Sequence, residues 1–223
     1  SVGADVSDTT TSSIVTGLTN GVVYAFRVVV ITGASTGIGA AVAKGFAAQG
    51  ARVAVHYNSS EAPALQVLEE IRAAGGDAIA LRADVRSVDA CRTLVAEAQQ
   101  RLGALDVLVN NAGGVVKRHP LHEIDDALYD DIVNLNARSV FACSRAAVPI
   151  MQAQGSGAII STTSVAARTG GGSKSTLYAA SKAFVSTFTR GLSGSAATKA
   201  STPRAWHASA RHSLTTACGS GDS

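Results

Sequence analysis

Charged and aromatic residues are scarce in this chain of 223 residues, at 16% and 4%. Nineteen Lys and Arg against sixteen Asp and Glu give a net charge of +3, and no basic run is longer than Lys117-Arg118. Such thin and scattered positive charge excludes an extended nucleic-acid surface. Long hydrophobic runs are also lacking, since no stretch reaches the roughly eighteen apolar residues of a membrane-spanning helix. We therefore expect neither a nucleic acid nor a membrane as a partner.

Cysteine is rare too, with only Cys91, Cys143 and Cys218 in the chain. Their spacing fits neither a disulfide framework nor a zinc site, and we interpret Cys143 as a small buried hydrophobe. Four histidines share no metal-ligand spacing with these cysteines: His119, His122, His207 and His212. We therefore assign no metal. The few cysteines favour a reducing compartment, and the first residues lack the charged and then apolar segments of a secretory signal, so we expect a cytoplasmic protein.

Hydrophobic residues make up 46% of the chain, enough for a substantial core, and this excludes disorder throughout. Between Arg27 and Leu192, continuous apolar runs alternate with segments of helical spacing. The sequence predicts strands at 28–32, 52–56, 78–81, 105–110 and 158–162, and helices at 38–49, 62–74, 88–102, 125–152 and 176–192. Uninterrupted apolar strands between helices are typical of a parallel sheet covered on both faces. The predicted fold is therefore α/β, a doubly wound, Rossmann-like sheet.

The two ends of the chain differ in composition from this middle part. Residues 1–26 contain no Lys or Arg and many Ser, Thr, Val and Gly, which indicates a separate leader. Tyr24, Phe26 and Val28 alternate after a Thr-Asn-Gly turn, and this pattern resembles the late strands of a fibronectin type III domain, although the segment is too short to close a sandwich. Residues 193–223 show no periodicity, and we expect a disordered or poorly packed tail.

A glycine-rich turn, Thr32-Gly33-Ala34-Ser35-Thr36-Gly37-Ile38-Gly39, follows the first predicted strand and opens the first predicted helix. In this context the glycines permit a tight turn and a close approach of the backbone to a pyrophosphate, which the helix N-terminus attracts. The turn therefore predicts a dinucleotide site. Its expected cofactor-binding residues are Gly33, Ser35, Thr36, Gly37, Ile38 and Gly39.

Two further motifs follow the glycine turn at characteristic separations: Asn110-Asn111-Ala112-Gly113 and Tyr178-Ala179-Ala180-Ser181-Lys182. With these three motifs in register, residues 27–192 resemble the short-chain dehydrogenase/reductase family, most of all its branch of 3-oxoacyl-carrier-protein reductases and sugar dehydrogenases. The resemblance implies hydride transfer between a nicotinamide cofactor and a small-molecule carbonyl or alcohol. It also implies a homodimer or homotetramer that associates through the two long helices.

The resemblance also bears on the choice of cofactor. NAD-preferring members end the second strand with an acidic residue, but Tyr57 stands there, followed by Asn58, Ser59 and Ser60, which could donate hydrogen bonds to a 2′-phosphate. We therefore favour NADP, with NAD as the alternative, although Thr36 occupies the place where many NADP-dependent members carry a basic residue. The remaining cofactor-binding residues implied by the resemblance are Asp84 and Val85 beside the adenine, and Asn110, Ala112 and Gly113 along the cofactor. A turn or helix-capping aspartate is the alternative interpretation of Asp84.

Tyr178 and Lys182 are four residues apart, so a helix projects both side chains from one face. A neighbouring ammonium stabilises a phenolate, and we expect Tyr178 to donate the proton in carbonyl reduction and to accept it in alcohol oxidation. The resemblance implies that Lys182 hydrogen-bonds the nicotinamide ribose, so both residues also belong to the cofactor site.

Two more catalytic residues are implied by the resemblance. Ser164, fourteen residues before Tyr178, is our choice for the serine that hydrogen-bonds the substrate carbonyl, with Ser161 as the competitor. Asn136, five residues before Phe141, fits the family's asparagine, which holds a water that connects the lysine to solvent. Asn134 is the alternative for that role.

After Leu192 the family pattern is no longer recognisable. Members of the family continue with a sixth strand, a Pro-Gly turn with a mobile substrate lid, and a seventh strand, whereas here Pro203 precedes Arg204 and Ala205. We therefore expect no strand after Leu192, the last strands of the sheet to be missing, and a tail that reflects a reading-frame change. A sheet edge left open in this way exposes apolar surface. The alternative to an active enzyme is thus a truncated, catalytically inactive chain that binds the cofactor.

Overall fold

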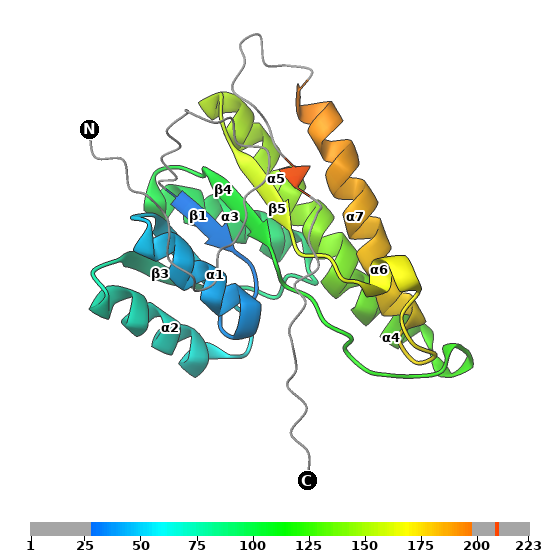
Figure 1. The fold of residues 1–223 in the computed structure, drawn as a ribbon. Helices are drawn as coiled ribbons and strands as arrows, with labels where there is room; N and C mark the ends of the chain where they lie inside the picture. The colour runs from blue at the N-terminus through cyan, green and yellow to red at the C-terminus, as the bar shows by residue number, and fades with distance from the viewer. Residues whose placement is uncertain (1–27, 198–207, 210–223) are drawn as a thin grey trace.

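The computed structural model describes residues 28–197 and 208–209 (Figure 1). The predicted leader, with its fibronectin-like pattern, and the predicted tail beyond residue 197, except for 208–209, lie outside the described residues. The strands are β1 (Val28–Ile31), β2 (Arg52–Tyr57), β3 (Asp77–Arg82), β4 (Val107–Asn110), β5 (Ala158–Ser161) and β6 (Ala208–Ser209). The helices are α1 (Gly37–Ala48), α2 (Glu61–Ala73), α3 (Val88–Leu102), α4 (Asp126–Val133), α5 (Ser139–Gln154), α6 (Ala166–Thr169) and α7 (Thr176–Ala197).

The strands form one sheet in the order β3-β2-β1-β4-β5-β6, and every neighbouring pair is parallel. The chain leaves β1 toward β2 on one side, and β4 lies on the other side of β1, so the strand order reverses between β1 and β4. Ligands of doubly wound sheets bind at the carboxyl ends of the strands beside such a reversal. The predicted α/β fold class is therefore confirmed.

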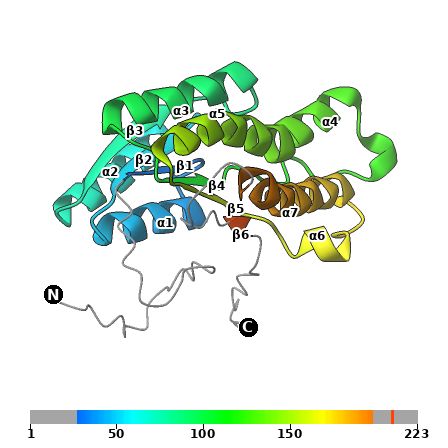
Figure 2. The ribbon, with the colours of Figure 1, turned by 90° about the horizontal axis from the view of Figure 1, so that it is seen from above.

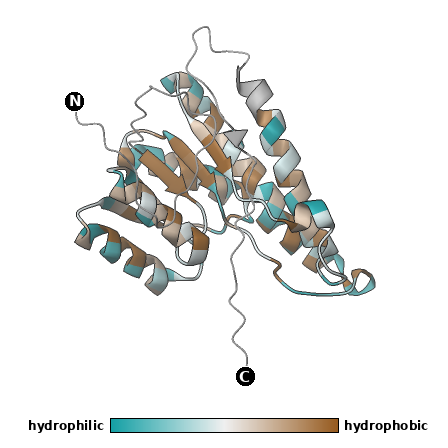
Figure 3. Cartoon of the chain, in the orientation of Figure 1, coloured by the Kyte–Doolittle hydropathy of each residue, from teal (hydrophilic) through white to brown (hydrophobic). Residues whose placement is uncertain are grey.

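The core consists of two layers, one on each face of the sheet, under the helices that Figure 2 shows on both sides of the strands. Val28 and Val30 of β1 face α3 and α5, whereas Val29 and Ile31 face α1 and α2, because successive side chains of a strand point to opposite faces. The central strands β1 and β4 are accordingly almost entirely hydrophobic (Figure 3). Burying each such side chain stabilises the fold by about 1.5–3 kcal/mol. Cys143 belongs to the first layer, which confirms its interpretation as a buried hydrophobe.

The helix predicted over 125–152 is divided in the structure. Helix α4 ends at Val133, the π-helical turn η2 (Asn134–Arg138) follows, and α5 begins at Ser139. The apolar periodicity alone does not reveal such a turn, because η2 continues the helical direction while it widens the coil. The short elements η1 (Leu121–Glu123) and α6 also lie within segments for which no element was predicted.

The expectation that no strand follows Leu192 is wrong. Helix α7 continues to Ala197, and β6 pairs in parallel with Ile159 and Ile160 of β5. Pairing of this kind needs only the backbone N–H and C=O groups at the open edge of β5. The small residues Ala208 and Ser209 can therefore form it without an apolar sequence pattern. The sheet position after β5 is thus taken, over two residues.

Candidate cofactor and active site

The glycine turn leaves the N-terminus of α1 open to an anion. Gly37 has a φ of +56°, and a Cβ on Gly39 would collide with the Gly33 carbonyl oxygen, so both positions need glycine. Thr36 precedes the helix without a side-chain cap, and the first turn carries no acidic residue. The N–H groups of Gly37, Ile38 and Gly39 therefore have no partner within the helix and lie at the positive end of its dipole. Such a turn can hold a pyrophosphate.

Thr32 and Asn111 tie this turn to the end of β4. The Thr32 hydroxyl accepts hydrogen bonds from the N–H groups of Asn111 and Ala112 at 2.9 and 3.0 Å. The Asn111 amide donates to the carbonyl oxygens of Thr32 and Gly33, both at 3.0 Å. These four bonds fix the spacing between the glycine turn and the segment that holds Ala112 and Gly113. The sequence motif contained Asn111, but its role in positioning the turn was not predicted.

A buried histidine supports the turn from the other side. His56 of β2 is 2% exposed, and its Nδ1 accepts the Gly33 N–H at 2.9 Å while its Nε2 lies 3.0 Å from the Ala83 carbonyl oxygen. The ring is therefore neutral, with the proton on Nε2. Burial lowers the pKa of His56 below its ordinary value, which keeps it in this form. Sequence analysis did not include His56 in the site.

The residues predicted for the adenosine end lie at the carboxyl ends of β2 and β3. Tyr57 is buried and donates to Glu61 of α2 at 3.1 Å, and Asn58 and Ser59 are exposed. Arg82 of β3 is the register partner of Tyr57. The structure therefore adds one acidic and one basic side chain to this region, Glu61 and Arg82, and neither residue was predicted to belong to the site.

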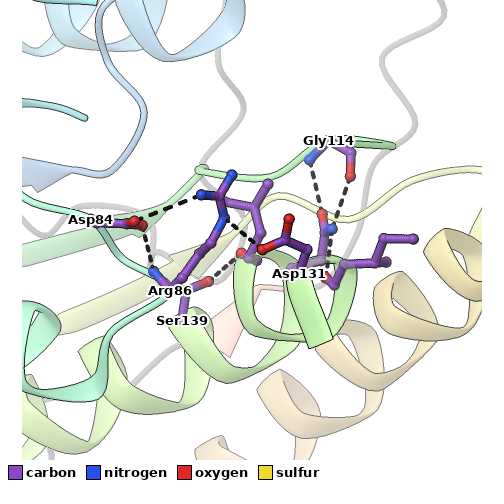
Figure 4. A network of polar contacts seen from close by, with 8 residues as sticks. Asp84, Arg86, Gly114, Asp131 and Ser139 are labelled. Carbon is purple, nitrogen blue, oxygen red and sulfur yellow. Dashed lines mark hydrogen bonds and ion pairs between the residues drawn. The ribbon is translucent and has the colours of Figure 1, made fainter. Parts of the chain in front are cut away.

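Asp84 lies in a turn, as the alternative interpretation of this residue predicted. Its carboxylate accepts the Arg86 N–H at 3.0 Å, while the cap of α3 is Ser87. Figure 4 shows the Arg86 side chain between Asp84 and Asp131, at 3.7 and 3.6 Å. Val85 beside Asp84 is buried. Arg86 thus connects the predicted adenine segment to α4.

The predicted residues of the second motif divide between two roles. Asn110 is buried, and its side-chain amide donates to Ser144 of α5 at 3.1 Å, so it holds β4 against that helix. Gly113 lies in the site, because a Cβ on it would come within 2.8 Å of both the Asn136 Oδ1 and the Lys182 Nζ. Lys182 and Asn136 therefore converge on one point next to the end of β4.

Tyr178 and Lys182 lie one turn apart on α7, as predicted. The Lys182 Nζ is 6.0 Å from the centre of the Tyr178 ring and donates to the Thr162 carbonyl oxygen at 3.0 Å. Lys182 is 3% exposed, and burial lowers its pKa from 10.5 to about 8. The amine thus stays protonated at neutral pH, which keeps a positive charge beside the phenol ring.

Asn136 is fully buried in the π-helical turn η2. Its amide donates to the carbonyl oxygens of Gly114 and Ile132 and accepts the Gly114 N–H, each at 2.9 Å. Figure 4 shows the two bonds to Gly114, and nearby Ser139 donates to the Leu135 carbonyl at 2.5 Å. The structure gives Asn134 no comparable contact with the loop after β4 among the bonds described. π-Helical turns often occur at functional sites, and this one places Asn136 beside Lys182.

The two candidate serines differ in their surroundings. Ser164 is half-buried in the loop after β5, and its hydroxyl accepts the Ala166 N–H at 3.2 Å. Ser161 is buried at the end of β5, and no partner is described for its hydroxyl within residues 28–197 and 208–209. Thr162 and Thr163 hold the loop against Lys182, since Thr162 accepts from the amine and the Thr163 hydroxyl donates to the Lys182 carbonyl at 3.0 Å. This fixes Ser164 close to α7.

Two general observations concern the part of the chain that the structure describes. Within it, no group of three or more His, Cys, Asp and Glu side chains is placed to hold a metal ion. None of its helices is both long and apolar enough to span a bilayer.

Comparison with known proteins identifies relatives of this chain. The family model described as short chain dehydrogenase matches residues 27–200. The hydroxynaphthalene reductase-like protein Arp2 of Metarhizium majus is 40% identical over 164 residues, which are 74% of this chain and 60% of that protein. The 3-oxoacyl-[acyl-carrier-protein] reductase FabG of Staphylococcus aureus is 40% identical over 155 residues, 70% of this chain and 62% of that protein.

A solved structure is also similar, the NADH-dependent reductase A1-R′ complexed with NAD. It is 39% identical, with a TM-score of 0.72 over 76% of this chain and 72% of that chain. The chain spans about 60% of the length of the curated relatives that it matches.

Proposed function

Because this chain belongs to the short chain dehydrogenase family, we propose that it is an oxidoreductase that transfers hydride between a nicotinamide dinucleotide and a carbonyl or secondary alcohol. The observation that carries the proposal is the buried Lys182 amine, one helical turn from Tyr178 and beside Gly113, in the segment that Thr32 and Asn111 join to the glycine turn. The proposed catalytic residues are Asn136, Ser164, Tyr178 and Lys182.

In the proposed reduction Tyr178 gives its hydroxyl proton to the substrate oxygen, and in the oxidation it takes that proton back. The bound nicotinamide would supply or accept the hydride. The Lys182 ammonium stabilises the negative charge that remains on the Tyr178 oxygen. It would also hydrogen-bond the nicotinamide ribose of the bound cofactor and orient it. Ser164 donates to the substrate oxygen, where charge develops. Asn136, held against Gly114, places a water that returns the proton through Lys182.

We propose NADP as the preferred cofactor. Asn58 and Ser59 are exposed at the end of β2, and Arg82 next to Tyr57 supplies the positive charge that the glycine turn lacks. Two observations favour NAD instead. Glu61 places a negative charge beside Tyr57, which would repel a 2′-phosphate, and the similar reductase A1-R′ is described as NADH-dependent. The ratio of kcat/KM for NADPH and NADH with one carbonyl substrate tests this choice. We expect the ratio to exceed one, and a ratio below one would overturn the preference.

We also propose that two copies associate through α5 and α7. Three of the five Phe residues of the chain gather there: Phe141 and Phe184 are 39% and 44% exposed, and both rings contact Phe188. Exposed aromatic clusters of this kind are typical of interfaces.

We propose as well that the chain works in a reducing compartment such as the cytoplasm. Cys91 and Cys143 are free thiols, which fits a reducing environment.

The alternative is a chain that binds the cofactor without turnover. The observation that favours it is the short strand beside β5, because β6 pairs with β5 over two residues, Ala208 and Ser209. A titration with NADPH, followed by its fluorescence, measures binding, and the loss of NADPH absorbance over a panel of ketones and a 3-oxoacyl thioester measures turnover. Binding with turnover supports the reductase, binding alone supports the alternative, and no binding contradicts both.

A further inference from the structure

A small pocket is lined in part by Tyr178 and by no residue of the glycine turn, and we call it the Tyr178 pocket. Its walls come from the segment after β4, from α4, and from the segment that leads into α7. Val115, Ile132 and Leu177 supply apolar surface, and the side chains of Lys117 and Lys174 also line it. A group that enters this pocket therefore contacts the Tyr178 side chain, two lysines and an apolar wall.

The charged side chains that line this pocket are both positive, Lys117 and Lys174. No Asp or Glu is among its lining residues. Lys117 and Lys174 are exposed, and neither has an ion pair within the described part of the chain. Five carboxylates follow Lys117 before the end of α4, and three of them have other partners: Glu123 contacts His119 at 3.2 Å, Asp125 accepts the Leu128 N–H at 2.8 Å, and Asp131 pairs with Arg86 at 3.6 Å. Asp126 and Asp130 are exposed. Two ammonium groups from different segments thus flank one apolar pocket, and no ion pair of either is described within residues 28–197 and 208–209.

The segment that carries Lys117 is also held in an unusual backbone conformation. Val116 has a φ of +61°, and the Lys117 N–H donates to the Val115 carbonyl oxygen at 2.7 Å, which closes a three-residue γ-turn. A β-branched residue in this region of φ is strained by about 1–3 kcal/mol, and such strain is concentrated at ligand-binding segments. The turn sets the direction of Lys117 next to the pocket wall formed by Val115.

We propose that Lys117 and Lys174 select carbonyl substrates that carry a carboxylate, so that the reaction at Tyr178 uses oxo acids in preference to neutral ketones. The apolar walls take the short carbon chain between the two functional groups. This inference rests on the proposed reductase function. An exposed ammonium interacts with a carboxylate weakly and in a salt-dependent manner, so each lysine is expected to change the KM about threefold and the pair about tenfold.

The test compares substrates that differ only in charge. Acetoacetate and 5-oxohexanoate are each paired with their primary amide, and KM and kcat are measured at low and at high ionic strength. The variants are Lys117→Gln, Lys174→Gln and the double variant. Lys44→Gln is the matched control, because Lys44 is an exposed lysine on α1 that pairs with Glu70 and does not line the pocket.

We expect wild type to have a lower KM for the acids than for the amides, and added salt to reduce the difference. The double variant should raise the KM of the acids about tenfold and leave the amides within about twofold, with kcat nearly unchanged. Equal KM values for acid and amide in wild type, or an equal loss for both in the variants, would overturn the inference.

A binding measurement separates this inference from the function on which it rests. If no carbonyl compound is reduced, the proposed function fails, and the shift in Tm that each acid and amide causes in the presence of NADP+ still reports on the pocket. A larger shift with the acids, lost in the double variant and kept in Lys44→Gln, supports the anion site. Equal shifts, or no shift with either compound, overturn it.

Discussion

Single residues of this protein are held in states that cost stability and serve the site. The Lys182 amine is almost completely buried, and the depression of its pKa to about 8 corresponds to a cost of about 3 kcal/mol for keeping it charged at neutral pH. His56 is the opposite case, since burial keeps it neutral and its two nitrogens connect the glycine turn with the end of β3. Both residues therefore make the protein sensitive to pH.

Lys182 should make the folded state more stable as the pH rises. Its pKa is lower in the folded protein than the 10.5 of an exposed lysine, so between about pH 8 and 10.5 the unfolded chain binds more protons, and stability increases with pH. From pH 7 to 9.5 the free energy of unfolding of wild type should rise by about 2 kcal/mol relative to Lys182→Met. Urea unfolding at both pH values measures this. A constant difference between the two proteins would show that the amine is not buried as described.

His56 should make cofactor binding fail in acid. Its pKa is below the ordinary 6.5, because the effect of burial exceeds the opposing effects of the Ala83 hydrogen bond and the Asp84 charge. This contribution to stability is therefore complete above about pH 6.5 and is lost as the pH falls through the folded value. A protonated ring cannot accept the Gly33 N–H. Calorimetry with NADP+ at pH 7.5 and 5.0 should show a Kd that rises at least about threefold more in wild type than in His56→Asn, whose amide oxygen can accept at any pH. Parallel pH curves for the two proteins would contradict this role.

At the scale of elements, the carboxyl ends of β1, β4 and β5 are joined into one unit with α7. Thr32 and Asn111 join the first two strands, Thr162 places its hydroxyl 3.4 Å from the Asn111 side-chain oxygen, and its carbonyl accepts from Lys182. Each of these bonds contributes about 1 kcal/mol to stability, but together they fix the distance between the glycine turn and Tyr178.

Much of this arrangement could be predicted from the sequence, and the reasons are local. The continuous apolar run at Val28–Ile31 and the glycines at 37 and 39 determine their own backbone, so β1, the turn and α1 were predicted within a residue or two. The Tyr178 and Lys182 spacing likewise follows from the helix period.

Other features depend on partners that are distant in the chain. In the sequence His56 is one residue of a strand, and its role depends on Gly33 and Ala83, which contact its two nitrogens. Asn136 lies in the π-helical turn and is bonded to Gly114, a residue outside its own helix. The pairing of β6 depends on the backbone edge of β5, which carries no sequence pattern. Whether Ser164 or Ser161 meets the substrate, and which residues contact the cofactor, remain predictions.

Two glycines of α1 provide a matched test of the turn. A Cβ at position 39 would strike the Gly33 carbonyl and come within 2.6 Å of the Asn111 amide, whereas a Cβ at position 45 would meet nothing within 4 Å. Gly39→Ala should cost about 1–3 kcal/mol and weaken NADPH binding about tenfold or more. Gly45→Ala should bind normally and gain about 0.5–1 kcal/mol in helix stability. Fluorescence titration and thermal unfolding report both effects, and normal binding by Gly39→Ala would remove the turn from the site.

At the scale of the whole molecule, the candidate site and the exposed aromatic rings occupy two different regions. The site lies at the carboxyl ends of the strands, and the rings lie on α5 and α7, with Arg145 of α5 5.3 Å from the centre of the Phe141 ring. Because Tyr178 and Lys182 are on α7 as well, association through these helices would also stabilise the catalytic helix.

Removing the aromatic surface should separate the subunits. Sedimentation velocity should give wild type a mass that is a multiple of 22.5 kDa, and Phe141→Ser with Phe184→Ser should raise the dissociation constant about tenfold or more. Leu65→Ser is the control, since Leu65 is an equally exposed apolar residue on α2. A monomeric wild type, or an equal effect of the control, would contradict the interface.

The replacement Tyr178→Phe tests the central claim most directly, because it removes one oxygen atom from the site and leaves the ring over Lys182. With a carbonyl substrate in excess, wild type should consume NADPH, and Tyr178→Phe should do so about 10²- to 10⁴-fold more slowly while it binds NADPH within about twofold of the wild-type Kd. Unchanged turnover in the variant would contradict the account of Tyr178 as the proton donor.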